Sequence, residues 1–271
     1  MKLALFQFAP AFGEPAANLA RIASAVRAHD AALWVLPELA TTGYAFADRE
    51  ECTALAEPVP GRSTDALLTL CRERSTRIVV GLAERHGGRL YNSAAYLAPD
   101  GVVAVYRKVH LFDRERLVFD PGPDPFRVHP LDAHRLGLMI CFDWIFPEAA
   151  RSLALQGADL LAHPANLVLP FGQAAMVTRS IENAVFCATA NRVGTERRAG
   201  VELTFTGGSQ VTDPQGHVLA RGPAGEEAVL VVEVDLARAR DKAITSRNDR
   251  FGDRRPECYA VGDAESLGPR R

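Results

Sequence analysis

Short and almost continuous apolar runs recur along the chain, and they restrict the fold more than any other feature. Runs of this length, without polar alternation, are typical of strands that both faces of a sheet bury. Amphipathic helical patterns separate several of them. The strand-like runs are residues 2–8, 32–36, 78–83, 136–140, 159–163 and 185–190. The helical patterns are residues 14–30, 64–74, 147–156 and 173–183.

Two turn signals add hairpins to this pattern. Pro99-Asp-Gly101 separates strand-like residues 91–98 from 102–107, and Asp213-Pro-Gln-Gly216 separates 208–212 from 218–221. A last strand is predicted over 228–234, whereas the prolines in 121–125 predict irregular structure over 109–125. Many strands with few helices favour an α/β fold in which two packed sheets are covered by helices.

The domain organisation follows from length and composition. A chain of 271 residues that is 48% hydrophobic can bury a substantial core, and its length fits one large domain as well as two small ones. Because the sequence shows no internal repeat and no linker, we predict a single domain over residues 1–260. The composition turns charged after Asp235, and residues 249–255 have little to bury. The segment 236–271 is therefore expected to be either a frayed tail or an arm that docks on a partner subunit.

Charge and cysteine content argue against several classes of function. The net charge is −2, and basic residues are dispersed rather than gathered in a stripe for nucleic acid. No apolar run has membrane-spanning length and no signal peptide precedes residue 3, so we expect a cytoplasmic protein. The five cysteines lack Cys-x-x-Cys spacing, and no glycine-rich phosphate loop occurs, so we expect no disulfide framework, metal or cofactor.

Cys141 lies where a predicted strand gives way to a predicted helix. The stretch Gly137–Ala150 runs from an apolar segment through the cysteine and Pro147 into an alanine-rich helical pattern. Ligands of open α/β sheets bind outside the carboxyl ends of strands, and helix-start amides favour thiolates and oxyanions. Taken alone, however, a cysteine is more often an inert core residue.

Two charged residues share this position at a strand end. Glu38 follows the apolar residues 32–36, and Lys108 follows 102–107. Each alone is more often a solvated charge or one end of a surface ion pair. Strands of one sheet bring such ends together, so the three residues jointly indicate a base, a cation and a nucleophile.

Each residue then has a chemical task. Cys141 would attack an electrophilic carbon, Glu38 would take the thiol proton and later activate water, and Lys108 would stabilise charge on the substrate. The backbone N–H of Phe142 would assist as an oxyanion donor. Glu115 is a second acid, although spacing alone favours a surface loop carboxylate. A hydrolase elbow is disfavoured because Met139 and Asp143 stand where it needs glycine.

A Cys-His dyad through His110 or His163 stays open, although either histidine is as easily structural. Arg179 and Glu182 lie three residues apart on one predicted helix and are expected to form a structural ion pair.

The motifs around these residues resemble those of the nitrilase superfamily, the carbon-nitrogen hydrolases with a Glu-Lys-Cys triad. They are Leu36-Pro-Glu-Leu39, Thr42-Gly-Tyr44, Tyr106-Arg-Lys-Val-His-Leu-Phe112, Ile140-Cys-Phe-Asp-Trp-Ile-Phe-Pro-Glu148, His163-Pro-Ala-Asn166, Arg179-Ser-Ile-Glu-Asn183, Asn191-Arg-Val-Gly194 and Gly207-Gly-Ser-Gln210. The resemblance implies an αββα sandwich that dimerises as αββα-αββα, with Glu38 as base, Lys108 as oxyanion stabiliser and Cys141 as nucleophile. It also implies that Glu115, in Glu115-Arg-Leu-Val-Phe-Asp-Pro-Gly122, is an additional active-site acid.

The resemblance also bears on the substrate. Phe142-Asp143 after the cysteine favours an amide or N-carbamoyl substrate, cleaved through a thioester with loss of ammonia or amine. The expected pocket wall is Tyr44, Phe112, Phe142, Trp144, Asn166 and Leu167. Alternatives are hydrolysis of a small aliphatic nitrile, acyl transfer, and a non-catalytic binding protein. A homodimer or higher homo-oligomer is the expected assembly.

Overall fold

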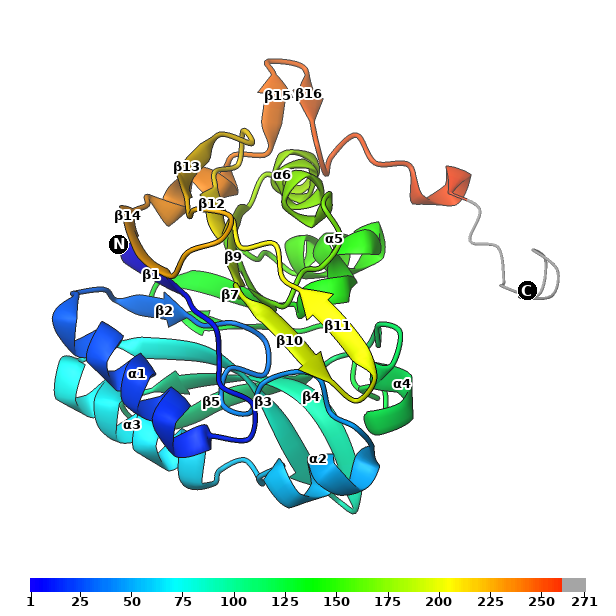
Figure 1. Ribbon diagram of the computed structural model, residues 1–271. Helices are drawn as coiled ribbons and strands as arrows, with labels where there is room; N and C mark the ends of the chain where they lie inside the picture. The colour runs from blue at the N-terminus through cyan, green and yellow to red at the C-terminus, as the bar shows by residue number, and fades with distance from the viewer. Residues whose placement is uncertain (260–271) are drawn as a thin grey trace, which may run out of the picture. The chain divides into compact units, whose positions relative to one another are not determined.

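The computed structural model describes residues 1–259 of the chain. The chain divides into two compact units, Met1–Asp241 and Lys242–Arg271. The first unit contains two six-stranded sheets, and the second contains a small two-stranded sheet (Figure 1). All the candidate site residues named above belong to the first unit.

The first sheet has three parallel strands next to each other and antiparallel strands on either side. Its order is β14-β1-β2-β3-β4-β5, in which β1, β2 and β3 are parallel. The strands are β1 (Lys2–Gln7), β2 (Leu33–Val35), β3 (Arg77–His86), β4 (Arg89–Ala98), β5 (Gly101–Arg107) and β14 (Ala228–Glu233). Because β2, β3 and β5 run in one direction, their carboxyl ends lie at the same edge of this sheet.

The second sheet is built in a similar way from the later part of the chain. Its order is β13-β12-β9-β8-β7-β6, in which β9, β8 and β7 are parallel. The strands are β6 (Val128–Leu131), β7 (His134–Leu138), β8 (Leu160–Ala165), β9 (Phe186–Asn191), β12 (Gln210–Thr212) and β13 (Val218–Arg221). The carboxyl ends of β7 and β8 therefore also share one edge.

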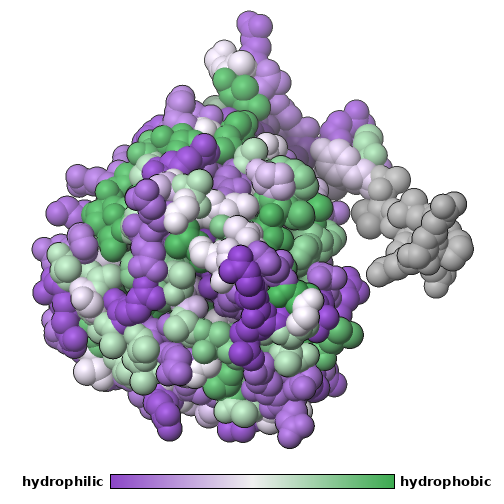
Figure 2. Space-filling view, in the orientation of Figure 1, coloured by the Kyte–Doolittle hydropathy of each residue, from purple (hydrophilic) through white to green (hydrophobic). Residues whose placement is uncertain are grey.

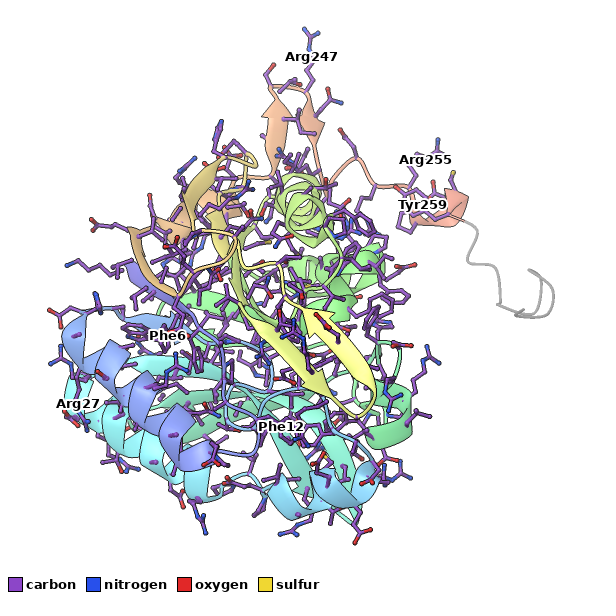
Figure 3. The ribbon with its side chains drawn as sticks, in the orientation of Figure 1. Phe6, Phe12, Arg27, Arg247, Arg255 and Tyr259 are labelled. Atoms are coloured by element: carbon purple, nitrogen blue, oxygen red, sulfur yellow. The ribbon has the colours of Figure 1, made fainter. Side chains whose placement is uncertain are left out.

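Helices flank the two sheets, which pack against each other through β1, β2 and β3 on one side and β8 and β9 on the other. Helices α1 (Pro15–Ala28) and α3 (Arg62–Arg74) belong to the first sheet, and α5 (Pro147–Leu155) and α6 (Gly172–Asn183) to the second (Figure 1). In α1, Ile22 and Val26 lie one turn apart and are fully buried, whereas Arg27 projects from the helix and pairs with Glu73 of α3 (Figure 3). The predicted architecture of two packed mixed sheets flanked by helices is confirmed.

Several short elements were missed by the sequence prediction. Residues 109–125 are not wholly irregular, because they contain the one-turn helix α4 (Glu115–Val118). A 3₁₀ helix, η1 (Cys141–Ile145), intervenes between β7 and α5. Strand β8 continues through Pro164, beyond the predicted strand end at residue 163. Among the described residues, this part of β8 pairs with β9 and not with β7, so a proline without N–H is tolerated. Also missed were α2 (Arg49–Leu55), β6, β10 (Thr195–Arg198), β11 (Val201–Thr204) and η2 (Leu236–Arg240).

The part of the second unit that the structure describes, residues 242–259, is largely exposed. It contains β15 (Ala243–Thr245), β16 (Asn248–Asp249) and η3 (Pro256–Cys258). The Asp249 carboxylate accepts the N–H groups of Phe251 and Gly252 at 2.8 and 2.7 Å, which closes a turn within the predicted low-burial stretch. The predicted domain over 1–260 and the partner-docking segment over 236–271 stay predictions, and residues 260–271 lie outside the described part of the chain.

Hydrophilic and hydrophobic residues are interspersed on the face of the molecule seen in Figure 2. No helix among residues 1–259 is both long enough and apolar enough to cross a lipid bilayer.

Candidate active site

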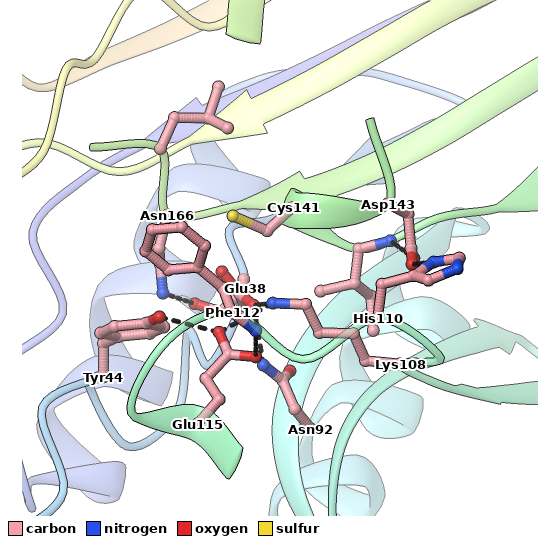
Figure 4. Close-up of polar contacts among 12 residues, drawn as sticks. Glu38, Tyr44, Asn92, Lys108, His110, Phe112, Glu115, Cys141, Asp143 and Asn166 are labelled. Carbon is pink, nitrogen blue, oxygen red and sulfur yellow. Dashed lines mark hydrogen bonds and ion pairs between the residues drawn. The ribbon is translucent and has the colours of Figure 1, made fainter. Parts of the chain in front are cut away.

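The two sheets bring the three predicted strand-end residues and Glu115 to one place. Glu38 follows β2, Lys108 follows β5, Glu115 is the first residue of α4, and Cys141 is the first residue of η1. All four are buried, with exposed fractions of 0, 1, 5 and 5%, respectively. Figure 4 shows the Cys141 sulfur beside the Glu38 and Lys108 side chains. The alternative interpretation of Glu38 and Lys108 as solvated surface charges is therefore wrong.

Lys108 links the two carboxylates. Its Nζ donates to Glu38 Oε1 at 2.6 Å and to Glu115 Oε1 at 2.7 Å (Figure 4). Burial by itself would lower the pKa of Lys108, but the carboxylates of Glu115 and Glu38 outweigh burial and raise this pKa above its ordinary value. Lys108 is thus a permanent cation in an enclosed site. An ammonium has three N–H donors, and the two carboxylates take two of them.

Glu38 is held by hydrogen bonds, but one of its two carboxylate oxygens accepts none. Asn92 Nδ2 donates to its Oε1 at 2.7 Å, and Asn166 Nδ2 donates to its main-chain carbonyl at 2.9 Å. Gly81 of β3 permits this packing, because an added Cβ there would lie 2.4 Å from the Glu38 Cα. The buried Oε2 accepts no hydrogen bond from any residue in 1–259. A buried acceptor left without a donor is costly, which marks Oε2 as an atom that is available for chemistry.

Glu115 completes the charged cluster and is fixed from two sides. Tyr44 Oη donates to its Oε1 at 2.8 Å, and the backbone N–H of Phe112 donates to its Oε2 at 3.1 Å. Burial raises the pKa of Glu115 to about 7, because Lys108 only partly offsets the loss of water and Glu38 adds a second negative charge. Glu115 is therefore an acid whose charge changes near neutral pH.

Cys141 has a strained backbone and a neutral thiol. Its φ is +40°, in the left-handed region that a residue with a Cβ rarely adopts. Burial, followed by the Glu38 charge, raises the pKa of the thiol well above its ordinary value, although Lys108 opposes this shift. The sulfur therefore needs a base to become a nucleophile.

The two histidines that left a Cys-His dyad open are engaged elsewhere. His163 Nε2 bonds the Cys141 carbonyl at 2.9 Å and Nδ1 bonds Thr189 Oγ1 at 3.1 Å, so both ring nitrogens have partners other than the sulfur. Burial lowers the pKa of His163, which keeps the ring neutral. His110 Nδ1 bonds Asp143 at 2.7 Å. The geometry therefore favours Glu38 over a histidine as the partner of the thiol.

Five of the six predicted wall residues surround the sulfur. A pocket is lined by Cys141 together with Phe112, Phe142, Trp144, Asn166, Leu167, Val168 and Leu169. Tyr44 instead lines a second pocket, which it shares with Glu115. The pocket beside the sulfur is small and mostly apolar, and polar groups meet it at the cysteine and Asn166. Val168 and Leu169 were not predicted.

Sequence reasoning missed two groups that hold the site in place. Asn92 binds Glu38. The only feature of the sequence that could have indicated this role is the position of Asn92, a polar residue near the start of the apolar strand β4. The buried Glu196 of β10 accepts the N–H of Ala45 at 2.6 Å and pairs with Arg192, which fixes the loop that carries Tyr44. No local pattern connects Glu196 to that distant loop.

The predicted ion pair between Arg179 and Glu182 is confirmed, with Nη1 and Oε1 3.0 Å apart. Arg179 Nε also donates to the Trp144 carbonyl at 3.1 Å, so this pair supports the chain near the pocket. Within residues 1–259, no group of three or more His, Cys, Asp or Glu side chains is arranged to hold a metal ion.

Comparison with known proteins agrees with this geometry. Residues 2–243 match the family profile described as carbon-nitrogen hydrolase. A nitrilase from Pyrococcus abyssi is 45% identical over 263 residues, which covers 96% of this chain and 99% of the relative. An (R)-stereoselective amidase from a Pseudomonas species is 38% identical, with coverage of 94% and 92%. The crystal structure of an amidase from Nesterenkonia superposes with a TM-score of 0.78 at 28% identity, covering 95% of this chain and 94% of that chain.

Proposed function

Because this chain belongs to the carbon-nitrogen hydrolase family, we propose that it hydrolyses a small amide or N-carbamoyl compound through a thioester on Cys141. The observation that carries this proposal is the buried Glu38–Lys108–Glu115 cluster beside the thiol, in which Glu38 Oε2 has no donor in the described chain. Glu38 is the general base, Lys108 the oxyanion stabiliser and Cys141 the nucleophile.

The first step forms the thioester. Glu38 takes the thiol proton as the Cys141 sulfur attacks the carbonyl carbon, so a C–S bond forms and the oxygen becomes an oxyanion. Lys108 Nζ and the backbone N–H of Phe142 stabilise that oxyanion; one such donor is typically worth about 3 kcal/mol. The intermediate collapses, the C–N bond breaks, and the proton held by Glu38 passes to the departing nitrogen, which leaves as ammonia or an amine.

The second step regenerates the thiol. Glu38 accepts a proton from water as the water oxygen attacks the thioester carbon. The C–S bond then breaks, the acid is released, and the proton on Glu38 returns to the sulfur. One water is consumed for each acid and each ammonia formed. The raised pKa of the thiol supports these two steps. Because the free thiol is neutral, a base must remove its proton when the thioester forms and return a proton to the sulfur when the thioester is hydrolysed.

Glu115 acts on Lys108 in this scheme. Its Oε1 accepts from both Lys108 Nζ and Tyr44 Oη, which directs the ammonium toward the space beside the sulfur. Phe112, Phe142, Trp144, Asn166 and Leu167 form the substrate wall in this proposal, with Tyr44 acting through Glu115. Little free space lies between the side chains that line this pocket, which supports a small acyl group.

Hydrolysis of a small aliphatic nitrile is the second candidate. The observation that favours it is the 45% identity to a protein named a nitrilase, whereas Phe142-Asp143 after the nucleophile favours an amide or carbamoyl group. A nitrile would consume a second water and give acid and ammonia with little free amide. Acyl transfer to an amine or hydroxyl is a third outcome of the same thioester.

Release of ammonia separates these candidates. The assay uses small amides, ω-amides of dicarboxylic acids, N-carbamoyl compounds and aliphatic nitriles, with Cys141→Ala measured in parallel. Release from amides or carbamoyl compounds that Cys141→Ala abolishes is the expected result. Release from nitriles alone would favour the second candidate, and product formation by Cys141→Ala would overturn the assignment of the nucleophile.

We further propose that the enzyme works in the cytoplasm as a homodimer or higher homo-oligomer, with segment 236–271 packed on a partner subunit. All five cysteines are free, which supports a reducing compartment.

Exposed apolar side chains occur on and beside α5 and α6, which supports a further subunit interface there: Ile145, Leu155, Phe171 and Ile181. Sizing of the full chain and of a chain ending at Asp235 tests the assembly; equal masses would contradict the role given to the segment.

A further inference from the structure

Asp143 is a fully buried carboxylate that accepts three hydrogen bonds. Its Oδ2 accepts from Tyr106 Oη at 2.7 Å and from the backbone N–H of Ile140 at 2.8 Å. Its Oδ1 accepts from His110 Nδ1 at 2.7 Å, and Figure 4 shows these two side chains in contact. Burial, followed by the Asp143 charge, raises the pKa of Tyr106 well above its ordinary value, so the phenol remains a donor. None of these contacts was needed for the mechanism above.

These contacts join the segment around Lys108 to the turn around Cys141. Tyr106 and His110 lie two residues before and two residues after Lys108, whereas Ile140 directly precedes Cys141. We propose that Asp143 is a positioning residue, which sets the place of the Lys108 ammonium relative to the Cys141 sulfur by holding Tyr106, His110 and Ile140. This inference rests on the proposed function, because it assigns Asp143 a role in that reaction.

Such a link is needed because the two catalytic residues come from different sheets. Lys108 follows β5 of the first sheet and Cys141 follows β7 of the second, so no strand ladder joins them. The Tyr106 hydroxyl extends the link, since it also accepts the N–H of Val109 at 3.2 Å. A single buried carboxylate thereby holds the residues on either side of Lys108 and also the strained turn at Cys141.

A positioning role and a purely structural role predict different measurements. If Asp143 only stabilised the fold, its loss would lower the amount of folded enzyme but leave the turnover of each folded molecule unchanged. A misplacement of reacting groups by about 1 Å can cost on the order of 10²-fold in rate, so a positioning role lowers kcat itself. Substrate affinity should change little, because Asp143 does not line the pocket beside the sulfur.

The test compares Tyr106→Phe, Asp143→Asn, the double variant and the matched control Tyr96→Phe. Tyr96 is also a buried tyrosine of the first sheet, on β4, and its Oη donates to the Pro130 carbonyl at 3.2 Å. For each variant kcat and KM are measured per mole of folded protein by ammonia release, together with thermal unfolding. The rate at which iodoacetamide alkylates Cys141 is a second readout, which needs no substrate.

We expect Tyr106→Phe to lower kcat and the alkylation rate about tenfold with KM within about twofold, and Asp143→Asn to lower them on the order of 10²-fold. Tyr96→Phe should leave kcat, KM and the alkylation rate unchanged. The double variant should have a kcat no lower than that of Asp143→Asn alone. An unchanged kcat and alkylation rate in Tyr106→Phe, or losses that multiply in the double variant, would overturn the inference. If the wild type released no ammonia, the proposed function would fail, while the alkylation rates would still decide the role of Asp143.

Discussion

Two buried ion clusters in the first unit differ in how completely their hydrogen bonds are satisfied. In the Arg192–Glu196 pair, the Glu196 carboxylate accepts from Arg192 and from the N–H groups of Tyr44 and Ala45. The Arg192 guanidinium also lies 4.1 Å from the centre of the Phe205 ring. In the Glu38–Lys108–Glu115 cluster, Glu38 Oε2 has no donor among residues 1–259.

Under the proposed function, this difference separates a structural cluster from a reactive one. A saturated buried pair fixes the backbone, as Glu196 does for the loop that carries Tyr44, and has no atom to spare for a substrate. An unsatisfied buried carboxylate costs stability, and such a cost persists where the group serves a reaction. We therefore expect the reactive cluster to control activity and the Arg192–Glu196 pair to control stability.

Glu38→Gln should give the largest effect. The amide keeps the shape of the side chain but cannot accept the thiol proton, so kcat/KM should fall on the order of 10⁴-fold. The thermal unfolding temperature should change little, because the hydrogen bond from Asn92 can persist. Ammonia release and a thermal scan measure the two quantities. A variant that kept more than a tenth of the wild-type activity would refute the assignment of Glu38 as base.

Arg192→Met should show the opposite behaviour. Removing the guanidinium leaves the buried Glu196 carboxylate without its cation, which should lower the free energy of unfolding by about 3–5 kcal/mol. Activity per folded molecule should fall far less than in Glu38→Gln. Urea denaturation measures the loss, and Glu196→Gln added to Arg192→Met should recover part of it. If Arg192→Met abolished turnover without loss of stability, the contrast between the clusters would be wrong.

The pH dependence of stability should reveal the raised pKa of Glu115. Because burial raises this pKa to about 7, the folded state holds the proton more tightly than the unfolded state does. Stability should therefore fall as pH rises from about 4.5 to about 7, by up to about 3 kcal/mol, and the penalty is complete above pH 7. Glu115→Gln should remove that part of the slope.

Urea denaturation of the wild type and Glu115→Gln at pH 5 and pH 8 tests this expectation. The variant should gain stability relative to the wild type between the two pH values. Glu202→Gln, whose side chain is 58% exposed, controls for the loss of one carboxylate. The same slope in the wild type and Glu115→Gln would show that Glu115 does not titrate in this range.

Thiol labelling should give the smallest contrast. Burial raises the pKa of Cys71 and of Cys187 to about 12, whereas Cys141 lines a pocket that a small electrophile can enter. Cys141 has the pocket and Glu38, so we expect it to react about tenfold faster with iodoacetamide. The advantage should disappear in Glu38→Gln. Equal rates at the three cysteines in the wild type would indicate an inert core thiol at position 141.

Local patterns predicted the strands that precede Glu38, Lys108 and Cys141. Apolar runs before Glu38, Lys108 and Cys141 predicted strands, and the common direction of β2, β3 and β5 explains why Glu38 and Lys108 meet. The two-sheet architecture followed from the number of such runs. These predictions succeeded because a strand that is buried on both faces requires a nearly continuous run of apolar residues, which can be recognised in the sequence.

The missed features depend on contacts between distant parts of the chain. The hairpin of β10 and β11 is polar, and Glu196 shows its importance only through the backbone of Tyr44 and Ala45. Helix α4 is a single turn, too short for a periodic signal. Asn92 and Asp143 each act across elements, so a local reading treats them as ordinary polar residues.

Trapping of an acyl-enzyme tests most directly the proposal that Cys141 carries the acyl group during turnover. Wild-type enzyme mixed with a small p-nitrophenyl ester and quenched in acid within one turnover should carry one acyl group, seen by intact mass spectrometry and located by peptide mapping on Cys141. Release of p-nitrophenolate should show a matching burst of one equivalent, and Cys141→Ala should show neither. Turnover without an adduct on Cys141, or an unchanged burst in Cys141→Ala, would contradict the account.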